Sequence, residues 1–71
     1  MPRWMNRTDW QNTRCPDDDE NLQKAKEAAM LEAADGLELC QRPGVWWLVD
    51  VHDGLEVVAE GYIKQGRYIA R

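Results

Sequence analysis

Residues 45–63, VWWLVDVHDGLEVVAEGYI, decide the fold. Two runs rich in β-branched and aromatic residues, 45–51 and 55–63, flank the segment His52-Asp53-Gly54. An Asp-Gly pair between two such runs is a strong short-range signal of a β-hairpin. A three-residue loop also favours a left-handed residue at its last position, where Gly54 stands. The sequence therefore predicts an antiparallel hairpin closed by residues 52–54.

Side-chain alternation distinguishes this loop from a two-residue loop. With three loop residues, Val49 faces Val57 and Trp47 faces Ala59, so one face of the hairpin is wholly apolar. With two loop residues, Trp47 faces Glu60 and both faces are mixed. We therefore expect the three-residue register, with its apolar face against a helix.

The opposite face of the hairpin is too apolar and aromatic for ordinary solvent-exposed surface. It also sets Asp50 directly across from Glu56, and like charges at paired positions are unfavourable. A basic partner would relieve that repulsion. The candidate partner-binding residues on this face are Trp46, Asp50, Glu56, Glu60, Tyr62 and Tyr68.

The segment Lys64-Gln65-Gly66 again has three residues ending in glycine. The same reasoning predicts a second three-residue loop, with Tyr62 facing Tyr68 across a short third strand. The expected sheet is a three-stranded antiparallel meander with strands at about 45–51, 55–63 and 67–70.

A helix is predicted at about residues 18–35, because strong helix formers dominate there without proline or glycine. Leu22 and a row of alanines form its apolar stripe. Asp17 is the expected N-cap and Gly36 the expected C-terminal cap. Residues 37–40 alternate and are compatible with a short extended segment.

Residues 1–14 show no sustained periodicity and are interpreted as an N-terminal arm, while residues 15–71 form a single α+β domain with the helix on one sheet face. We expect Trp4 and Trp10 to pack on the sheet or the helix, because exposed tryptophan is costly. Coverage of the outer sheet face by this arm and coverage by a partner are equally open.

The net charge of −4 is unevenly distributed. Residues 1–14 carry three arginines against one aspartate, whereas residues 15–71 carry six basic against twelve acidic residues. The acidic body is therefore expected not to bind nucleic acid directly, because phosphates would be repelled. It suits a partner with a basic surface.

Enzymatic chemistry, cofactors and metals are not expected. The sequence has no phosphate-binding loop or hydrolase motif, and its single histidine, His52, is predicted at an exposed hairpin tip. Cys15 and Cys40 fall short of a zinc signature. They lie at opposite ends of the expected helix, roughly 25 Å apart, so free thiols are predicted. No apolar run is long enough for a membrane span, and without a secretory signal a cytoplasmic location is expected.

The acidic balance, the helix over residues 17–35 and the hairpin with Trp46 and Trp47 resemble small phage-encoded inhibitors of host machinery, of the anti-CRISPR type. The resemblance implies a non-catalytic inhibitor, working in the cytoplasm of a host bacterium, that blocks a basic, nucleic-acid-binding surface of a host protein. Two alternatives stay open. One is a structural homodimer, and the other is a nucleic-acid-binding regulator that uses the basic aromatic arm, with residues Arg3, Trp4, Arg7, Trp10 and Arg14.

Overall fold

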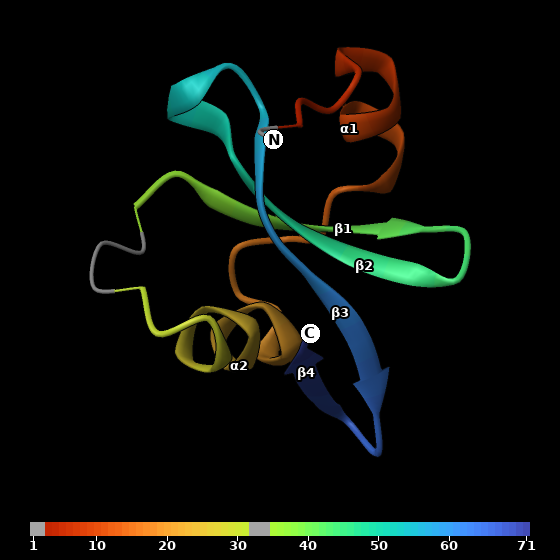
Figure 1. Cartoon of the computed structure of the whole chain (residues 1–71), viewed down its shortest axis with the longest axis vertical. Coiled ribbons are helices and arrows are strands. Elements are labelled where there is room, and N and C mark those ends of the chain that lie inside the picture. Colours follow the sequence, from red (N-terminus) through yellow and green to blue (C-terminus); the bar gives the residue numbers. More distant parts are fainter. Residues whose placement is uncertain (1–2, 32–34) are drawn as a thin grey trace.

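A four-stranded antiparallel sheet with strand order β1-β2-β3-β4 is the centre of the structure (Figure 1), a computed structural model that describes residues 3–31 and 35–71. The α+β class is confirmed, but residues 3–31 and 35–71 contain two helices and four strands where one helix and three strands were expected. The elements in chain order are α1 (Arg7–Thr13), α2 (Glu20–Ala28), β1 (Leu37–Arg42), β2 (Val45–Asp50), a 3-10 turn (Val51–Asp53), β3 (Glu56–Lys64) and β4 (Arg67–Ala70).

The β2–β3 hairpin combines both registers that the sequence allows. Next to the turn, Asp50 faces Glu56, as the three-residue loop predicts. A bulge then leaves Val58 without a partner in β2, and beyond it Trp47 faces Glu60 instead of Ala59. The predicted register is therefore wrong beyond the bulge. Because one extra residue reverses the alternation of a strand, Ala59 and Glu60 exchange the faces that were predicted for them.

Helix α2 covers one face of the sheet. Leu22 and Ala25, fully buried members of the predicted helical stripe, pack against Leu39 and Leu48. Trp46 is half-buried at the edge of this cluster. The helix thus covers the face that carries Trp46 and Leu48, and not the face with Trp47 and Val49 as predicted.

The N-terminal segment covers the other face. Met5 is buried in a second cluster with Cys40, Val49 and Leu55. Trp10, on the unexpected helix α1, packs beside this cluster. The expectation that both arm tryptophans pack is met by Trp10, but Trp4 is 60% exposed.

Residues 3–15 also hydrogen-bond to the sheet at two places. The Met5 amide donates to the Leu55 carbonyl (2.8 Å), and the Val57 amide donates to the Arg3 carbonyl (2.8 Å). After α1, the Cys15 amide donates to the Leu39 carbonyl (2.8 Å) at the outer edge of β1. The chain therefore wraps from β3, across one face by α1, to β1, and then returns over the other face by α2 (Figure 1).

Helix α2 is shorter than predicted at both ends. Its N-cap is Asp19, not Asp17, and the Asp19 carboxylate accepts hydrogen bonds from the next turn. At the other end, the Met30 amide donates to the Glu27 carbonyl (3.0 Å) while Met30 takes a left-handed φ of 56°. This is the hydrogen-bonding of a Schellman cap, with methionine where glycine is usual. Residues 32–34 lie outside the described residues, so the predicted helix is not described there, and Gly36 instead precedes β1.

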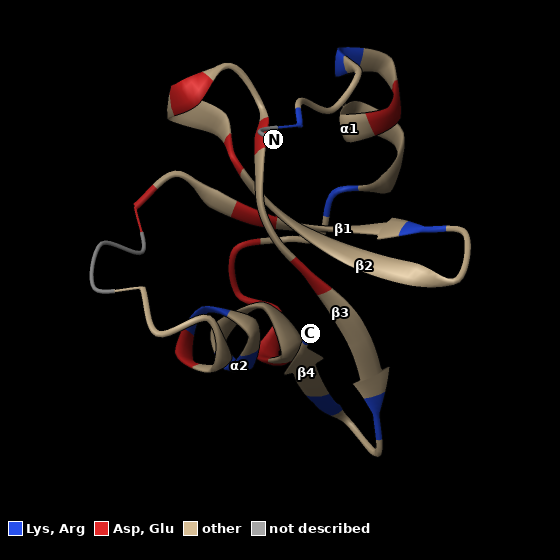
Figure 2. Ribbon diagram, viewed as in Figure 1, with Lys and Arg blue, Asp and Glu red and all other residues tan. Residues whose placement is uncertain are grey.

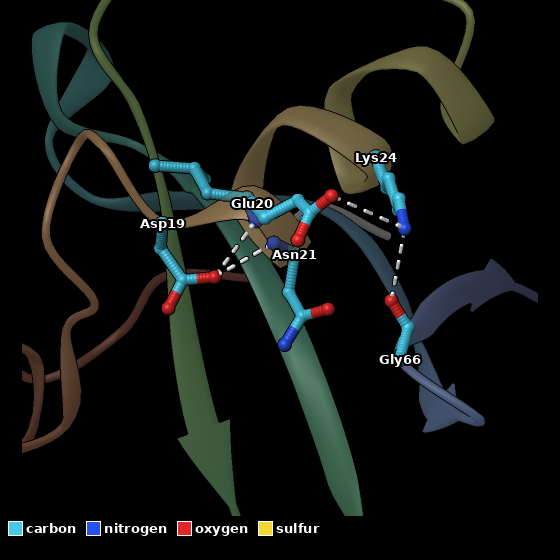
Figure 3. A network of polar contacts seen from close by, with 6 residues as sticks. Asp19, Glu20, Asn21, Lys24 and Gly66 are labelled. Atoms are coloured by element: carbon cyan, nitrogen blue, oxygen red, sulfur yellow. Dashed lines mark hydrogen bonds and ion pairs between the residues drawn. The ribbon is translucent and has the colours of Figure 1, made fainter.

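The β3–β4 turn has two residues where three were predicted. Lys64 faces Arg67, and Gln65 and Gly66 both take left-handed conformations (φ 53° and 75°). Figure 3 shows how Lys24 holds this turn to α2, because its Nζ atom lies 3.8 Å from Glu20 and 3.4 Å from the Gly66 carbonyl oxygen.

This shorter turn places Tyr68 on the face opposite Tyr62. Tyr68 faces Ile63 instead of Tyr62, and both side chains lie on the α2 side of the sheet. The Tyr68 hydroxyl donates to the Trp46 carbonyl (3.2 Å). Burial raises the pKa of Tyr68 to about 12.

Candidate functional site

Three carboxylates meet at the end of the β2–β3 hairpin. Asp50 is the last residue of β2, Asp53 lies in the turn and Glu56 begins β3. We call these three residues the acidic tip, and Figure 2 shows them as red segments around the hairpin end. The Asp50 carboxylate also accepts a hydrogen bond from the His52 amide (2.9 Å), which fixes its position in the turn.

The backbone of the tip is held by the core beneath it. Gly54 and Leu55 both take left-handed conformations, with φ values of 67° and 70°. That conformation is unfavourable for leucine, but it directs Leu55 into the core, where it is 6% exposed. The Leu55 amide donates to the Asp50 carbonyl (3.1 Å), and its carbonyl accepts from Met5 (2.8 Å). The acidic side chains therefore project from a rigid turn.

The electrostatics of the tip are unfavourable in the isolated protein. A hydrogen bond with Asp53, together with the negative charges of Asp53 and Asp50, raises the pKa of Glu56 above its ordinary value. Four ion pairs link residues within the described ranges, and each uses an acidic residue elsewhere: Glu60, Glu38, Glu20 or Asp9. Within the same ranges, the acidic tip has no cation at ion-pair distance.

Trp4 lies beside the acidic tip. It pairs with Glu56 at an isolated antiparallel bridge, and its ring lies near Gly54. Because residues at paired positions share a sheet face, its exposed indole lies on the same side as the Glu56 carboxylate. Trp4 was expected to be a packing residue and was not among the predicted site residues. No feature of the sequence distinguishes it from the buried Met5 that follows.

The other predicted site residues lie elsewhere. Arg3 pairs with Glu60 (2.7 Å), and its hydrogen bond lowers the pKa of that carboxyl. Tyr62 is 41% exposed on the sheet face opposite α2, whereas Tyr68 is 4% exposed beneath α2. Trp46 borders the α2 core. Of the six predicted residues, the structure thus pairs Asp50 with Glu56 at the tip and joins Tyr68 to Trp46 on the α2 side, so the six do not form one surface.

Two of the three arginines of the arm are engaged in contacts. Arg3 lies 5.3 Å above the Trp47 ring in addition to its pair with Glu60. Arg14 lies 4.9 Å above the Trp10 ring and 3.5 Å from Glu38. These contacts fix the arm on the sheet.

The cysteines are closer than the sequence suggests. Cys15 follows Arg14, which pairs directly with Cys40 on β1, so the predicted separation of about 25 Å is wrong. Both thiols are nevertheless free, and burial raises the pKa of Cys15 and that of Cys40, the latter to about 11. They pack in clusters on opposite sheet faces.

Two further features bear on function. Residues 3–31 and 35–71 contain no group of three or more acidic, cysteine or histidine side chains that could hold a metal ion. No helix in this part of the chain has the length and apolar character needed to cross a membrane.

Searches with the whole chain found no matching family model, curated protein or solved structure.

Proposed function

We propose that the protein is a non-catalytic binding module whose acidic tip docks on a basic surface of another protein. The observation that carries this proposal is the direct pairing of Asp50 with Glu56, next to Asp53, on a fixed turn. Like charges at paired positions cost stability in the free protein. A guanidinium or ammonium group placed between them would remove that repulsion on binding.

The rigidity of the tip supports a role in binding. A surface that is already ordered loses little conformational entropy when it docks. The hydrogen bonds of Leu55 order the turn, and Trp4 adds an exposed aromatic ring beside the carboxylates. An aromatic ring within a charged rim is a common arrangement at protein interfaces.

The finer proposal is inhibition. Basic protein surfaces commonly bind nucleic-acid phosphates. A module that places three carboxylates on such a surface competes with those phosphates for the same cations. The protein then acts as an inhibitor by occupancy, as phage anti-CRISPR proteins do.

The test is affinity capture from a bacterial lysate with two matched variants. Asp53→Lys/Glu56→Lys reverses two charges at the tip and leaves the Asp50 hydrogen bond to His52 in place. Asp18→Lys/Glu27→Lys makes the same change in charge at exposed positions near and on α2. We expect a partner that the native protein and the α2 variant retain and that the tip variant loses.

A second step measures inhibition directly. The captured partner is assayed for nucleic-acid binding with increasing amounts of the native protein, and we expect the native protein to displace the nucleic acid. Retention of every captured protein by the tip variant would refute docking through the tip. Capture without loss of nucleic-acid binding would refute inhibition and leave an adaptor role.

A further inference from the structure

A second like-charged pair lies at the other end of β3. Lys64 faces Arg67 across the β3–β4 turn, and both residues are exposed. Glu56 and Lys64 are separated by eight residue steps, which corresponds to roughly 26 Å along an extended strand. The strand thus carries an unfavourable acidic pair at one end and an unfavourable basic pair at the other.

An exposed pair of one aromatic and one aliphatic side chain adjoins the basic pair. Tyr62 faces Ile69, and these side chains are 41% and 38% exposed. Because side chains alternate along a strand, Tyr62 and Lys64 lie on the same face of β3. Their neighbours Ile63 and Tyr68 pack against the α2 core, so this is the face opposite α2. We call these four exposed residues the basic platform: Tyr62, Lys64, Arg67 and Ile69.

More cationic groups lie next to the basic platform. Trp47, which faces Glu60 on the same side of the sheet, has Arg3 and Arg42 within 5.3 and 5.2 Å of its ring centre. The Trp47 Nε1 and Arg42 Nε atoms are buried beneath these contacts. The positively charged groups on this face therefore extend from the β3–β4 turn toward Trp47.

The net negative charge of residues 15–71 does not describe the sheet face that carries the basic platform. Residues 15–71 are acidic as a whole, and seven of their twelve acidic residues belong to the tip or to positions 17–20 at the start of α2, while Figure 2 shows further acidic segments on β1 and β3. On the platform side, Glu60 is paired with Arg3, and Asp9 lies 3.5 Å from Arg42. Lys64 and Arg67 have no acidic residue at ion-pair distance within the described ranges.

We propose that the basic platform binds single-stranded nucleic acid. Tyr62 offers an exposed ring on which one base can stack, while Lys64 and Arg67 lie on the same face for the adjoining phosphates. Stacking on an aromatic side chain requires an unpaired base, because the bases of a duplex are already stacked. An acidic protein surface would pair with Lys64 and Arg67, but it would offer no base to stack on the Tyr62 ring.

The test is fluorescence anisotropy with a fluorescein-labelled twelve-residue oligothymidylate at low salt. Lys64→Glu/Arg67→Glu removes the basic pair, and we expect at least a tenfold loss of affinity. Tyr62→Ala removes the stacking surface, and we expect a loss of roughly fivefold or more. The native protein should also bind more weakly as salt rises, because phosphate contacts release counterions.

Matched controls separate this site from general charge and from the acidic tip. Arg7→Glu/Lys26→Glu makes the same change in net charge on α1 and α2, and its affinity should stay within about threefold of native. Asp53→Lys/Glu56→Lys should not weaken oligonucleotide binding, because the tip lies at the other end of β3. Circular dichroism of each variant verifies that the fold is retained.

Three outcomes would overturn the proposal. The first is no binding at low salt by the native protein. The second is equal loss of affinity in the platform variant and the α1–α2 control. The third is that Tyr62→Ala binds the oligonucleotide as tightly as the native protein does, while the native protein binds polyglutamate as tightly as the oligonucleotide. That result would make the platform a docking surface for acidic proteins or for the tip of a second copy.

Discussion

The role of Met5 can be tested by comparison with Met30. Met5 is 5% exposed in the core cluster on the α1 side, whereas Met30 is 88% exposed after α2. Replacement of each by alanine makes the same chemical change in two different environments. Loss of a buried methionine side chain costs about 2–5 kcal/mol, because apolar contacts disappear and a cavity remains.

We expect Met5→Ala to lower the free energy of unfolding by about 3 kcal/mol, within this range. A domain of 71 residues has a total stability of roughly 4–11 kcal/mol, so this loss is large. The thermal midpoint should fall by roughly 12–24 °C. Met30→Ala should change the free energy of unfolding by less than about 0.5 kcal/mol, because surface substitutions seldom do more.

Urea unfolding, followed by tryptophan fluorescence and by far-ultraviolet circular dichroism, measures both variants. Similar midpoints for Met5→Ala and Met30→Ala would refute the conclusion that residues 3–5 belong to the core. The result would then support an arm that can leave the sheet without loss of fold.

Three further predictions follow from local geometry and charge. Met30→Gly should raise the free energy of unfolding by about 0.5–1 kcal/mol, measured by urea unfolding, because glycine takes the left-handed cap without the strain of a side chain. Glu56→Gln should raise the thermal midpoint at pH 7 but not at pH 3. The raised pKa of Glu56 means that the folded protein loses stability as pH rises above the ordinary carboxyl range, and glutamine removes that loss. Cys15 and Cys40 should react slowly with a thiol-specific disulfide reagent at pH 8 and rapidly in urea, because burial raises the pKa of both thiols.

The hairpin was predictable because its turn is encoded locally. Asp53-Gly54 lies between two apolar runs, and the pairing of Asp50 with Glu56 follows from the loop length. The bulge at Val58 was not predictable in this way. In the registers of the two-residue and the three-residue loop alike, β3 places apolar residues on each of its faces. Sequence periodicity alone therefore does not show where one register changes to the other.

Two of the misplaced site residues follow from such changes of register. The bulge moves Glu60 to the face that carries Trp47, and the two-residue β3–β4 turn places Tyr68 on the face opposite Tyr62. Trp46 is misplaced for another reason, because α2 packs on its side of the sheet. Gln65 takes a left-handed conformation in the β3–β4 turn, and glutamine is not a residue that signals such a turn. Alternation alone therefore could not identify the buried tyrosine.

The elements that the sequence did not reveal depend on tertiary contacts. Helix α1 has seven residues, too few to be stable alone, and its place on the sheet is held by Trp10 and the preceding Met5. Strand β1 was expected only as a short extended segment. It forms because β2 pairs along its whole length and Cys15 hydrogen-bonds to its outer edge.

Contact between the acidic tip and a basic partner can be mapped residue by residue. The experiment is amide chemical-shift mapping, in which the isotopically labelled protein is titrated with the partner recovered by affinity capture. We expect the largest shifts at residues 50–56 and at Trp4, with little change along α2. Largest shifts along α2, with the tip unchanged, would contradict contact through the tip.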